Sequence, residues 1–171
     1  MGKIILILGG ARSGKSRFAV SLARQYKKVA FIATGEARDK EMRSRIALHK
    51  QARPKSWQTF EETEGLAPLL KKVGKAFDCL IIDCLTLWVS NLILSGHKEA
   101  AILKKAEALF EVLKKQKGKV IIVSNEVGLG IVPQNRLARV FRDIAGRVNQ
   151  FVAKEADRVF FAVAGIAAKI K

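Results

Sequence analysis

Eight residues near the start of the chain have the types and the spacing of a phosphate-binding loop. The pattern G-x-x-x-x-G-K-[S/T] is matched by Gly9, Gly10, Ala11, Arg12, Ser13, Gly14, Lys15 and Ser16. In such a loop, backbone N–H groups and the N-terminus of the next helix point at phosphate oxygens. Lys15 can reach the β- and γ-phosphates of a nucleoside triphosphate, and the Ser16 hydroxyl can bind Mg²⁺. A chance glycine turn is the alternative, but every fixed position of the pattern is filled.

Asp83 is a second candidate for nucleotide chemistry. It ends an apolar run that begins at Cys79 and is typical of a buried strand. In proteins with a phosphate loop, a carboxylate at such a strand end acts on Mg²⁺ or its water shell. An N-cap for the following helix is the alternative. The phosphate loop upstream favours the metal role, so Ser16 and Asp83 are the predicted metal ligands.

His49 is one of two histidines, and its imidazole could serve as a nucleophile or a proton carrier. It falls on a helix predicted over residues 39–51, on the same face as Ile46. A lone histidine on a half-apolar helix face is more often structural than catalytic. Lys50 and Arg53 strengthen the functional interpretation because they could hold a triphosphate.

The candidate residues must be positioned by strands and helices that end or begin beside them. A strand over residues 3–8 precedes the phosphate loop, and a helix over residues 16–23 follows it. The next strand, 29–33, ends at Thr34, Gly35 and Glu36. Ligands of open α/β sheets bind at the carboxyl ends of strands, so this turn is a predicted nucleotide contact, with an ordinary connecting turn as the alternative. Further strands are predicted at 56–61, 79–83, 119–124 and 158–164, and further helices at 66–73, 85–94, 100–117 and 136–155.

Strands alternating with helices predict an α/β fold with a mostly parallel central sheet flanked by helices. The order of the motifs favours the RecA-like branch of P-loop NTPases, in one domain spanning residues 1–171. The strand at 158–164 is expected to be the last, followed by a basic tail. The core stripe predicted for the helix at 136–155 comprises Leu137, Val140 or Phe141, Ile144, Val148, and Phe151 or Val152.

The net charge of +17 fits either a polyanionic partner or a lysine-rich solvated surface. The lysines are scattered and no aromatic residues interleave them, so no nucleic-acid partner is predicted. Cys79 and Cys84 are expected to be buried free thiols. The charge-free run at 159–168 is about half the ~20 residues of a membrane span. We therefore expect a cytoplasmic protein without a membrane span.

Motifs spread along nearly the whole chain resemble those of one enzyme family, the bifunctional adenosylcobinamide kinase and adenosylcobinamide-phosphate guanylyltransferase of cobalamin synthesis. The most specific are the loop at 125–133, Asn-Glu-Val-Gly-Leu-Gly-Ile-Val-Pro, and the helix that follows it. The others are the phosphate loop, residues 32–34, Arg45-Ile46, His49-Lys50 and Arg53-Pro54. The resemblance implies a RecA-like fold and a homotrimer.

The resemblance also implies the reactions and the site. Such enzymes phosphorylate the aminopropanol hydroxyl of adenosylcobinamide with ATP or GTP. They then transfer GMP from GTP to adenosylcobinamide phosphate through a guanylylated histidine, which matches His49. Mg²⁺ accompanies the nucleotide. Beyond the phosphate loop, the implied nucleotide contacts are Thr34, Gly35, Glu36, Lys50, Gln51, Ala52, Arg53, Glu61 and Asp83.

Three rival hypotheses remain open. A small-molecule kinase of the same fold would transfer the γ-phosphate but form no guanylyl adduct. A RecA-like, nucleic-acid-stimulated ATPase would bind DNA or RNA with a strong salt dependence. A chain that has kept only the transferase activity would have lost the kinase step.

Overall fold

The structure is a computed structural model that describes residues 3–37, 40–51 and 53–171, without the side chains of Met42, Arg45, Leu48, His49 and Gln51. Its centre is a sheet in which seven described strands stand in the order β3-β2-β4-β5-β1-β6-β7. All neighbours pair in parallel except β6 and β7. The strands are β1 (Ile4–Gly9), β2 (Val29–Ala33), β3 (Gln58–Glu61), β4 (Cys79–Asp83), β5 (Lys119–Asn125), β6 (Arg158–Val163) and β7 (Ile166–Lys169).

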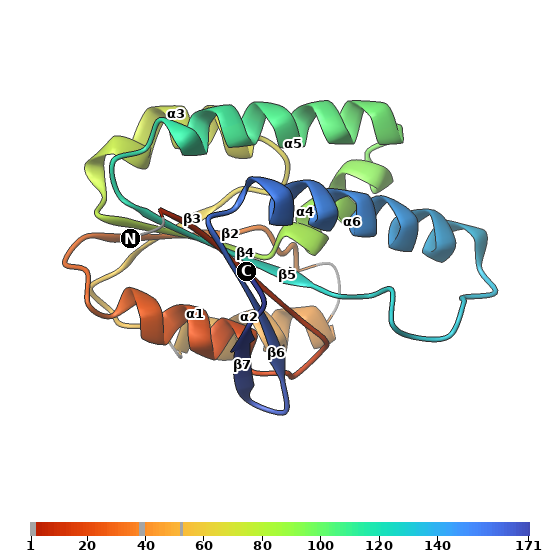
Figure 1. Ribbon diagram of the computed structural model, residues 1–171, viewed down its shortest axis with the longest axis horizontal. Coiled ribbons are helices and arrows are strands. Elements are labelled where there is room, and N and C mark those ends of the chain that lie inside the picture. The colour runs from red at the N-terminus through yellow and green to blue at the C-terminus, as the bar shows by residue number, and fades with distance from the viewer. Residues whose placement is uncertain (1–2, 38–39, 52) are drawn as a thin grey trace.

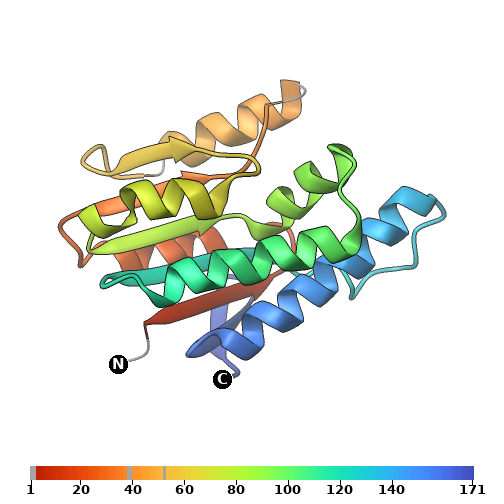
Figure 2. The same ribbon diagram turned by 90° about the horizontal axis from the view of Figure 1, so that it is seen from above.

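Helices cover both faces of this sheet, so the central strands are apolar between their ends. Figure 1 shows α1 and α2 on one side and α3, α4, α5 and α6 on the other. Viewed from above, α3, α5 and α6 lie side by side (Figure 2). The helices are α1 (Lys15–Ala23), α2 (Lys40–Gln51), α3 (Leu66–Val73), α4 (Leu85–Leu94), α5 (Glu99–Lys114) and α6 (Arg136–Glu155), with a 3₁₀ turn at Gly74–Ala76.

Alternate residues of the central strands belong to two separate cores. Ile5 and Ile7 of β1 pack on the α1 side together with Phe31. Leu6 of β1 and Ile82 of β4 pack on the opposite side, under α3 to α6. Because every second side chain points the same way, one strand supplies both layers.

The register brings the strand ends together at one edge. Gly9 of β1 is level with Asn125 of β5, and Asp83 of β4 is level with Ala33 of β2. β5 therefore stands between the strand that enters the phosphate loop and the strand that ends in Asp83. This is the edge at which parallel α/β sheets bind ligands.

The strand predicted at 158–164 is present as β6, but the prediction that it is the last strand, followed only by a basic tail, is wrong. β6 ends at Val163, and Ala164 and Gly165 turn the chain back with φ of 51° and 85°. β7 then runs antiparallel to β6 and forms one edge of the sheet, and β3 forms the other. A two-residue turn with both φ positive matches the twist of a hairpin.

Three further details differ from the predictions. Leu137 and Val140 of α6 are exposed, because the amino-terminal end of this helix extends past the sheet (Figure 2). α5 ends at Lys114, three residues before the predicted end. The strand predicted at 56–61 begins only at Gln58, and Trp57 just before it is buried on the α1 side. In the described part of the chain, no helix has the length and apolar character needed to cross a membrane.

Candidate active site

The phosphate loop joins the end of β1 to the first turn of α1. Gly14, the N-cap of α1, has φ of 91°, a conformation that glycine adopts without strain. The N–H of Ser13 donates to the carbonyl of Gly10 over 3.3 Å, which closes the loop into a turn. The first amides of α1 are therefore directed into the loop, where they can bind anions.

Lys15 folds back over this loop. Its Nζ donates to the carbonyl oxygen of Gly10 over 2.8 Å, and the residue is buried. Burial lowers the pKa of Lys15 below its ordinary value, while interactions with Cys84 and Asp83 oppose that change. The charge of Asp83 therefore acts on the Lys15 ammonium, although the two residues are 68 positions apart in the sequence.

Asp83 and Ser16 are half-buried and belong to the same edge, Asp83 at the end of β4 and Ser16 in the first turn of α1. The described residues contain no cluster of three or more His, Cys, Asp or Glu side chains that could hold a metal ion. Magnesium bound with a nucleotide does not need such a cluster, because phosphates and water supply most of its oxygens. One hydroxyl and one carboxylate are a sufficient protein contribution, so the donor set fits Mg²⁺.

Thr34 is fully buried and ties two strand ends together. Its Oγ1 donates to the carbonyl of Cys84 over 2.6 Å and accepts from the N–H of Cys84 over 2.9 Å. Asn91 of α4 donates to the carbonyls of Thr34 (2.8 Å) and Thr63 (3.2 Å). The side chain of Thr34 therefore fixes the edge on which its neighbours Gly35 and Glu36 are displayed.

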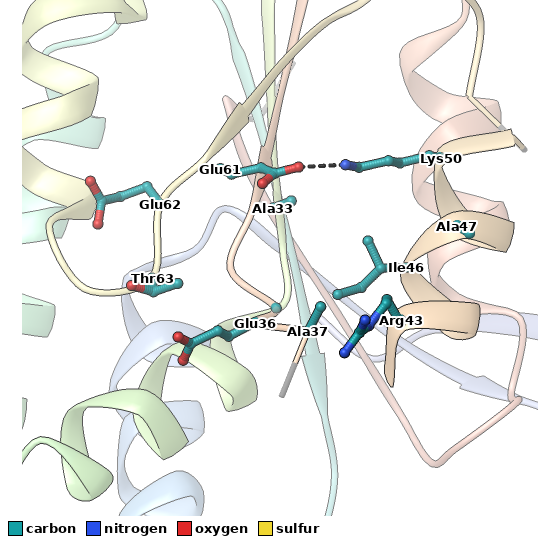
Figure 3. Close-up of a pocket in the computed structure, with 11 residues that line it drawn as sticks. Ala33, Glu36, Ala37, Arg43, Ile46, Ala47, Lys50, Glu61, Glu62 and Thr63 are labelled. Atoms are coloured by element: carbon teal, nitrogen blue, oxygen red, sulfur yellow. Dashed lines mark hydrogen bonds and ion pairs between the residues drawn. The ribbon is translucent and has the colours of Figure 1, made fainter. Parts of the chain in front are cut away.

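A cavity of about 450 Å³ opens between α2 and the ends of β2 and β3. Figure 3 shows Arg43, Ile46 and Lys50 entering it from α2, and Glu36 and Glu61 on the opposite side. The remaining lining residues are Ala33, Gly35, Ala37, Ala47, Glu62 and Thr63. Lys50 thus faces the Glu61 carboxylate, while the Glu36 carboxylate points away from α2, and the space between is large enough for a nucleoside.

Lys50 and Glu61 form an ion pair across this cavity, with 2.5 Å between Nζ and Oε1 (Figure 3). Both side chains are well exposed, at 49% and 63%. Exposed pairs of this kind contribute at most about 1 kcal/mol, because water screens them. Lys50 can therefore exchange the carboxylate for a phosphate at little cost.

Arg53 follows α2 and packs its guanidinium on the ring of Phe31. Its Nε and Nη1 are buried and lack hydrogen-bond partners. Burial lowers the pKa of Arg53, and the nearby carboxylates of Asp83 and Glu61 oppose that change. The guanidinium is therefore a fixed cation on β2, within electrostatic reach of Asp83 and Glu61.

The site residues named from the sequence therefore form two groups on one edge. The phosphate loop lies at β1 and the cavity at β2 and β3, with β5 and β4 between them. Since neighbouring strands are about 4.8 Å apart, β1 and β2 are separated by about 14 Å. Position 49 belongs to α2, the helix that lines the cavity. The side chains of His49 and Gln51, and the whole of Ala52, lie outside the described residues.

Sequence reasoning missed a set of buried polar groups that hold this edge. The Ser124 hydroxyl donates to Asn149 Oδ1 over 2.7 Å, and Asn149 Nδ2 donates to the carbonyl of Asn125 over 3.0 Å. The N–H of Asn125 in turn donates to Thr86 Oγ1. Polar residues inside apolar runs are the only signal the sequence offers, because buried polar groups need partners.

Comparison with known proteins places the chain among relatives of one family. Residues 5–170 match the family described as cobinamide kinase / cobinamide phosphate guanyltransferase. The chain is 47% identical over 167 residues to the bifunctional adenosylcobalamin biosynthesis protein CobP of Pseudomonas aeruginosa, covering 97% of this chain and 96% of that protein. It is also 44% identical over 180 residues to the bifunctional adenosylcobalamin biosynthesis protein CobU of Salmonella typhimurium. This match covers 98% of this chain and 99% of that protein.

Solved structures of more distant proteins confirm the fold. A KaiC-like protein of Pyrococcus horikoshii superimposes with a TM-score of 0.54 at 17% identity, over 94% of this chain and 70% of that one. The RadB recombinase gives a TM-score of 0.54 at 15% identity, over 94% and 74%. Both the predicted P-loop fold and the family resemblance are confirmed. The chain belongs to the cobinamide kinase / cobinamide phosphate guanyltransferase family.

Proposed function

We propose that this enzyme phosphorylates adenosylcobinamide with ATP or GTP and then transfers GMP from GTP to adenosylcobinamide phosphate through a guanylylated His49. The observation that carries the proposal is the arrangement of one sheet edge. A phosphate loop with Lys15 and Asp83 shares that edge with a cavity lined by α2, the helix to which His49 belongs.

In the kinase step, the aminopropanol hydroxyl oxygen attacks the γ-phosphorus, and the nucleoside diphosphate leaves as the hydroxyl gives up its proton. Lys15 and the amides of residues 13–16 are proposed to bind the phosphate oxygens and stabilise their charge. Ser16 and Asp83 would hold Mg²⁺, which neutralises charge on the β- and γ-phosphates. The chain's own contribution is to fix the triphosphate in line with the hydroxyl.

In the guanylyl step, an imidazole nitrogen of His49 attacks the α-phosphorus of GTP, and pyrophosphate leaves. A phosphate oxygen of adenosylcobinamide phosphate then attacks the same phosphorus, the imidazole leaves, and a phosphoanhydride forms. Two steps avoid bringing an anionic phosphate directly against a triphosphate, because neutral imidazole is the first nucleophile. Lys50 and Arg53 are proposed to hold the phosphates, and Glu36 and Glu61 to line the nucleoside pocket. Gln51 and Ala52 complete the proposed contacts.

We further propose that the enzyme acts in the cytoplasm, where its nucleotides are available, as a homotrimer without a nucleic-acid partner. Support for assembly comes from apolar side chains on the loop after β5 and the start of α6. Leu129, Ile131 and Val132 are exposed at 80%, 97% and 59%, and Leu137 and Val140 continue the surface. Contiguous exposed apolar residues mark interaction surfaces.

Incubation with α-labelled GTP tests the proposal. The protein should acquire acid-labile label, and adenosylcobinamide phosphate should remove it as labelled product. In a parallel reaction, γ-label should pass to adenosylcobinamide. Transfer of γ-label without any protein adduct would instead support a plain kinase. Turnover that depends on added DNA or RNA, with strong salt dependence, would support the ATPase alternative.

A further inference from the structure

The turn of the β6–β7 hairpin lies directly against the phosphate loop. The N–H of Gly165 donates to the carbonyl of Ser13 over 3.1 Å. A Cβ added to Gly14 would come within 3.1 Å of the Gly165 Cα, so the two backbones are in van der Waals contact. Figure 1 shows the hairpin extending beside α1, the helix that the loop begins.

The other fixed glycine of the motif faces the same hairpin. Gly9 is level with Ala162 of β6, and a Cβ on Gly9 would lie 2.5 Å from the Ala162 carbonyl oxygen. Both fixed glycines therefore allow close approach of the hairpin. This adds to the expected requirement that the loop pass close to phosphate.

The hydrogen bond to Ser13 determines where the next amide points. The Ser13–Gly14 peptide bond is trans, so its C=O and N–H point in opposite directions. With the carbonyl held by Gly165 outside the loop, the N–H of Gly14 is directed away from the hairpin, toward the inside of the loop. That is the orientation in which a loop amide donates to a phosphate oxygen.

We propose that the β6–β7 turn holds the phosphate loop in its anion-binding shape, and that Gly165 is a positioning residue for the nucleotide. The inference rests on the proposed role of residues 9–16 in binding phosphate. Since Gly165 acts through the Ser13–Gly14 peptide and touches no base, it should affect ATP and GTP by the same factor.

Gly96 provides a matched control. Its φ is also 85°, and its N–H also donates to a backbone carbonyl, that of Ile93, over 3.0 Å. It lies between α4 and α5 and has no heavy atom within 4 Å of an added Cβ, other than its chain neighbours. Proline at either position removes one backbone hydrogen bond and cannot adopt the positive φ.

The test compares wild type, Gly165→Pro and Gly96→Pro by thermal unfolding and by calorimetric titration with Mg-ATP and Mg-GTP. Gly165→Pro should raise both dissociation constants about tenfold, the scale of one lost hydrogen bond, whereas Gly96→Pro should leave them within about twofold. Gly165→Pro binding both nucleotides like wild type would overturn the inference and leave the proposed function intact. Wild type that binds neither nucleotide would overturn both.

A second pair covers the case in which Gly165→Pro does not fold. Gly165→Ala keeps the N–H but adds a methyl group 3.1 Å from an Arg17 guanidinium nitrogen, in a backbone conformation that alanine disfavours. Gly96→Ala has the same backbone penalty without any contact. Weaker binding of both nucleotides by Gly165→Ala alone supports the inference, and equal binding by the two variants contradicts it.

Discussion

The guanidinium carbon of Arg53 lies 3.5 Å from the centre of the Phe31 ring. Phe31 is a buried residue of β2, so this contact anchors the segment after α2 to the sheet. Two guanidinium nitrogens, Nε and Nη1, are buried and lack hydrogen-bond partners. The stacking fixes the orientation of the guanidinium, which lowers the ordering cost of the phosphate contact proposed for Arg53.

Arg53→Lys should weaken both the contact with Phe31 and the proposed phosphate binding. An ammonium group cannot stack flat on a ring and does not present a planar pair of donors. Loss of the ring contact should lower the free energy of unfolding by about 0.5 to 2 kcal/mol. The dissociation constant for GTP should rise as well. Urea unfolding and titration with GTP measure the two effects. Arg24→Lys, on the exposed end of α1, is the control and should change neither. Unchanged GTP binding in Arg53→Lys would remove this residue from the nucleotide site.

His49→Ala should abolish covalent labelling by α-labelled GTP and leave transfer of the γ-phosphate largely intact, since only the guanylyl step uses an imidazole. His97→Ala is the control, because His97 is the only other histidine in the sequence. It lies in the connection after α4, with its Nε2 3.7 Å from a carboxylate oxygen of Glu64. Labelled protein is recovered on a denaturing gel and counted. Label retained by His49→Ala would refute the assignment.

Lys15→Ala should impair both activities, because each reaction is proposed to use the triphosphate held by the phosphate loop. The loss in kcat should be about 100-fold or more, the scale seen when a group that stabilises developing charge is removed. Lys27→Ala, at an exposed position after α1, should behave as wild type. Steady-state assays of the kinase and guanylyl steps measure the two losses. Near-normal kinase turnover of Lys15→Ala would count decisively against a role of Lys15 in holding the triphosphate.

Asp157 makes the stability depend on pH at the acid end. Its Oδ2 accepts hydrogen bonds from the N–H groups of Ile4 and Lys3, each at 2.7 Å, and these bonds lower the pKa of Asp157 in the folded state. A carboxylate with a lowered folded pKa stabilises the fold above its unfolded pKa of about 3.9, and that contribution is lost as the pH falls through the folded value.

Asp157→Asn should therefore be less stable than wild type at pH 7, by about 1 kcal/mol for the weaker hydrogen bonds of a neutral acceptor. The difference in free energy of unfolding between the two proteins should narrow as the pH falls from 5 toward 2, because Asp157 of wild type becomes protonated and loses its charge. Urea unfolding at several pH values gives both curves. A gap that stays constant over that range would show that the charge on Asp157 does not contribute.

Local patterns were sufficient to predict much of the fold and part of the candidate site. The bounds of α3, α4 and α6 agree with prediction because each helix carries its own periodicity and end signals. α6, for example, begins after Asn135, whose side chain accepts from the N–H of Ala138. The phosphate loop is recognisable because its chemistry is confined to consecutive residues.

Features that depend on distant parts of the chain were not predictable. The partners of Thr34 are 50 and 57 positions away, so no local pattern indicates that its hydroxyl is used by Cys84. Helical periodicity assigns Leu137 to an apolar face, but it cannot say how far the sheet extends beneath it. The turn at Ala164 and Gly165 lies inside a charge-free run without the Asn-Gly pair that usually indicates a hairpin.

The sheet ends on both sides in a four-residue strand, β3 or β7, and each of these strands finishes with a charged residue, Glu61 or Lys169. Such margins offer few consecutive unpaired amides and carbonyls to another polypeptide. Extending the sheet from molecule to molecule is therefore disfavoured, which protects the protein against fibrous aggregation. Copies of this chain are expected to associate through helix and loop surfaces. Hydrogen bonds between strands are then expected only within each subunit.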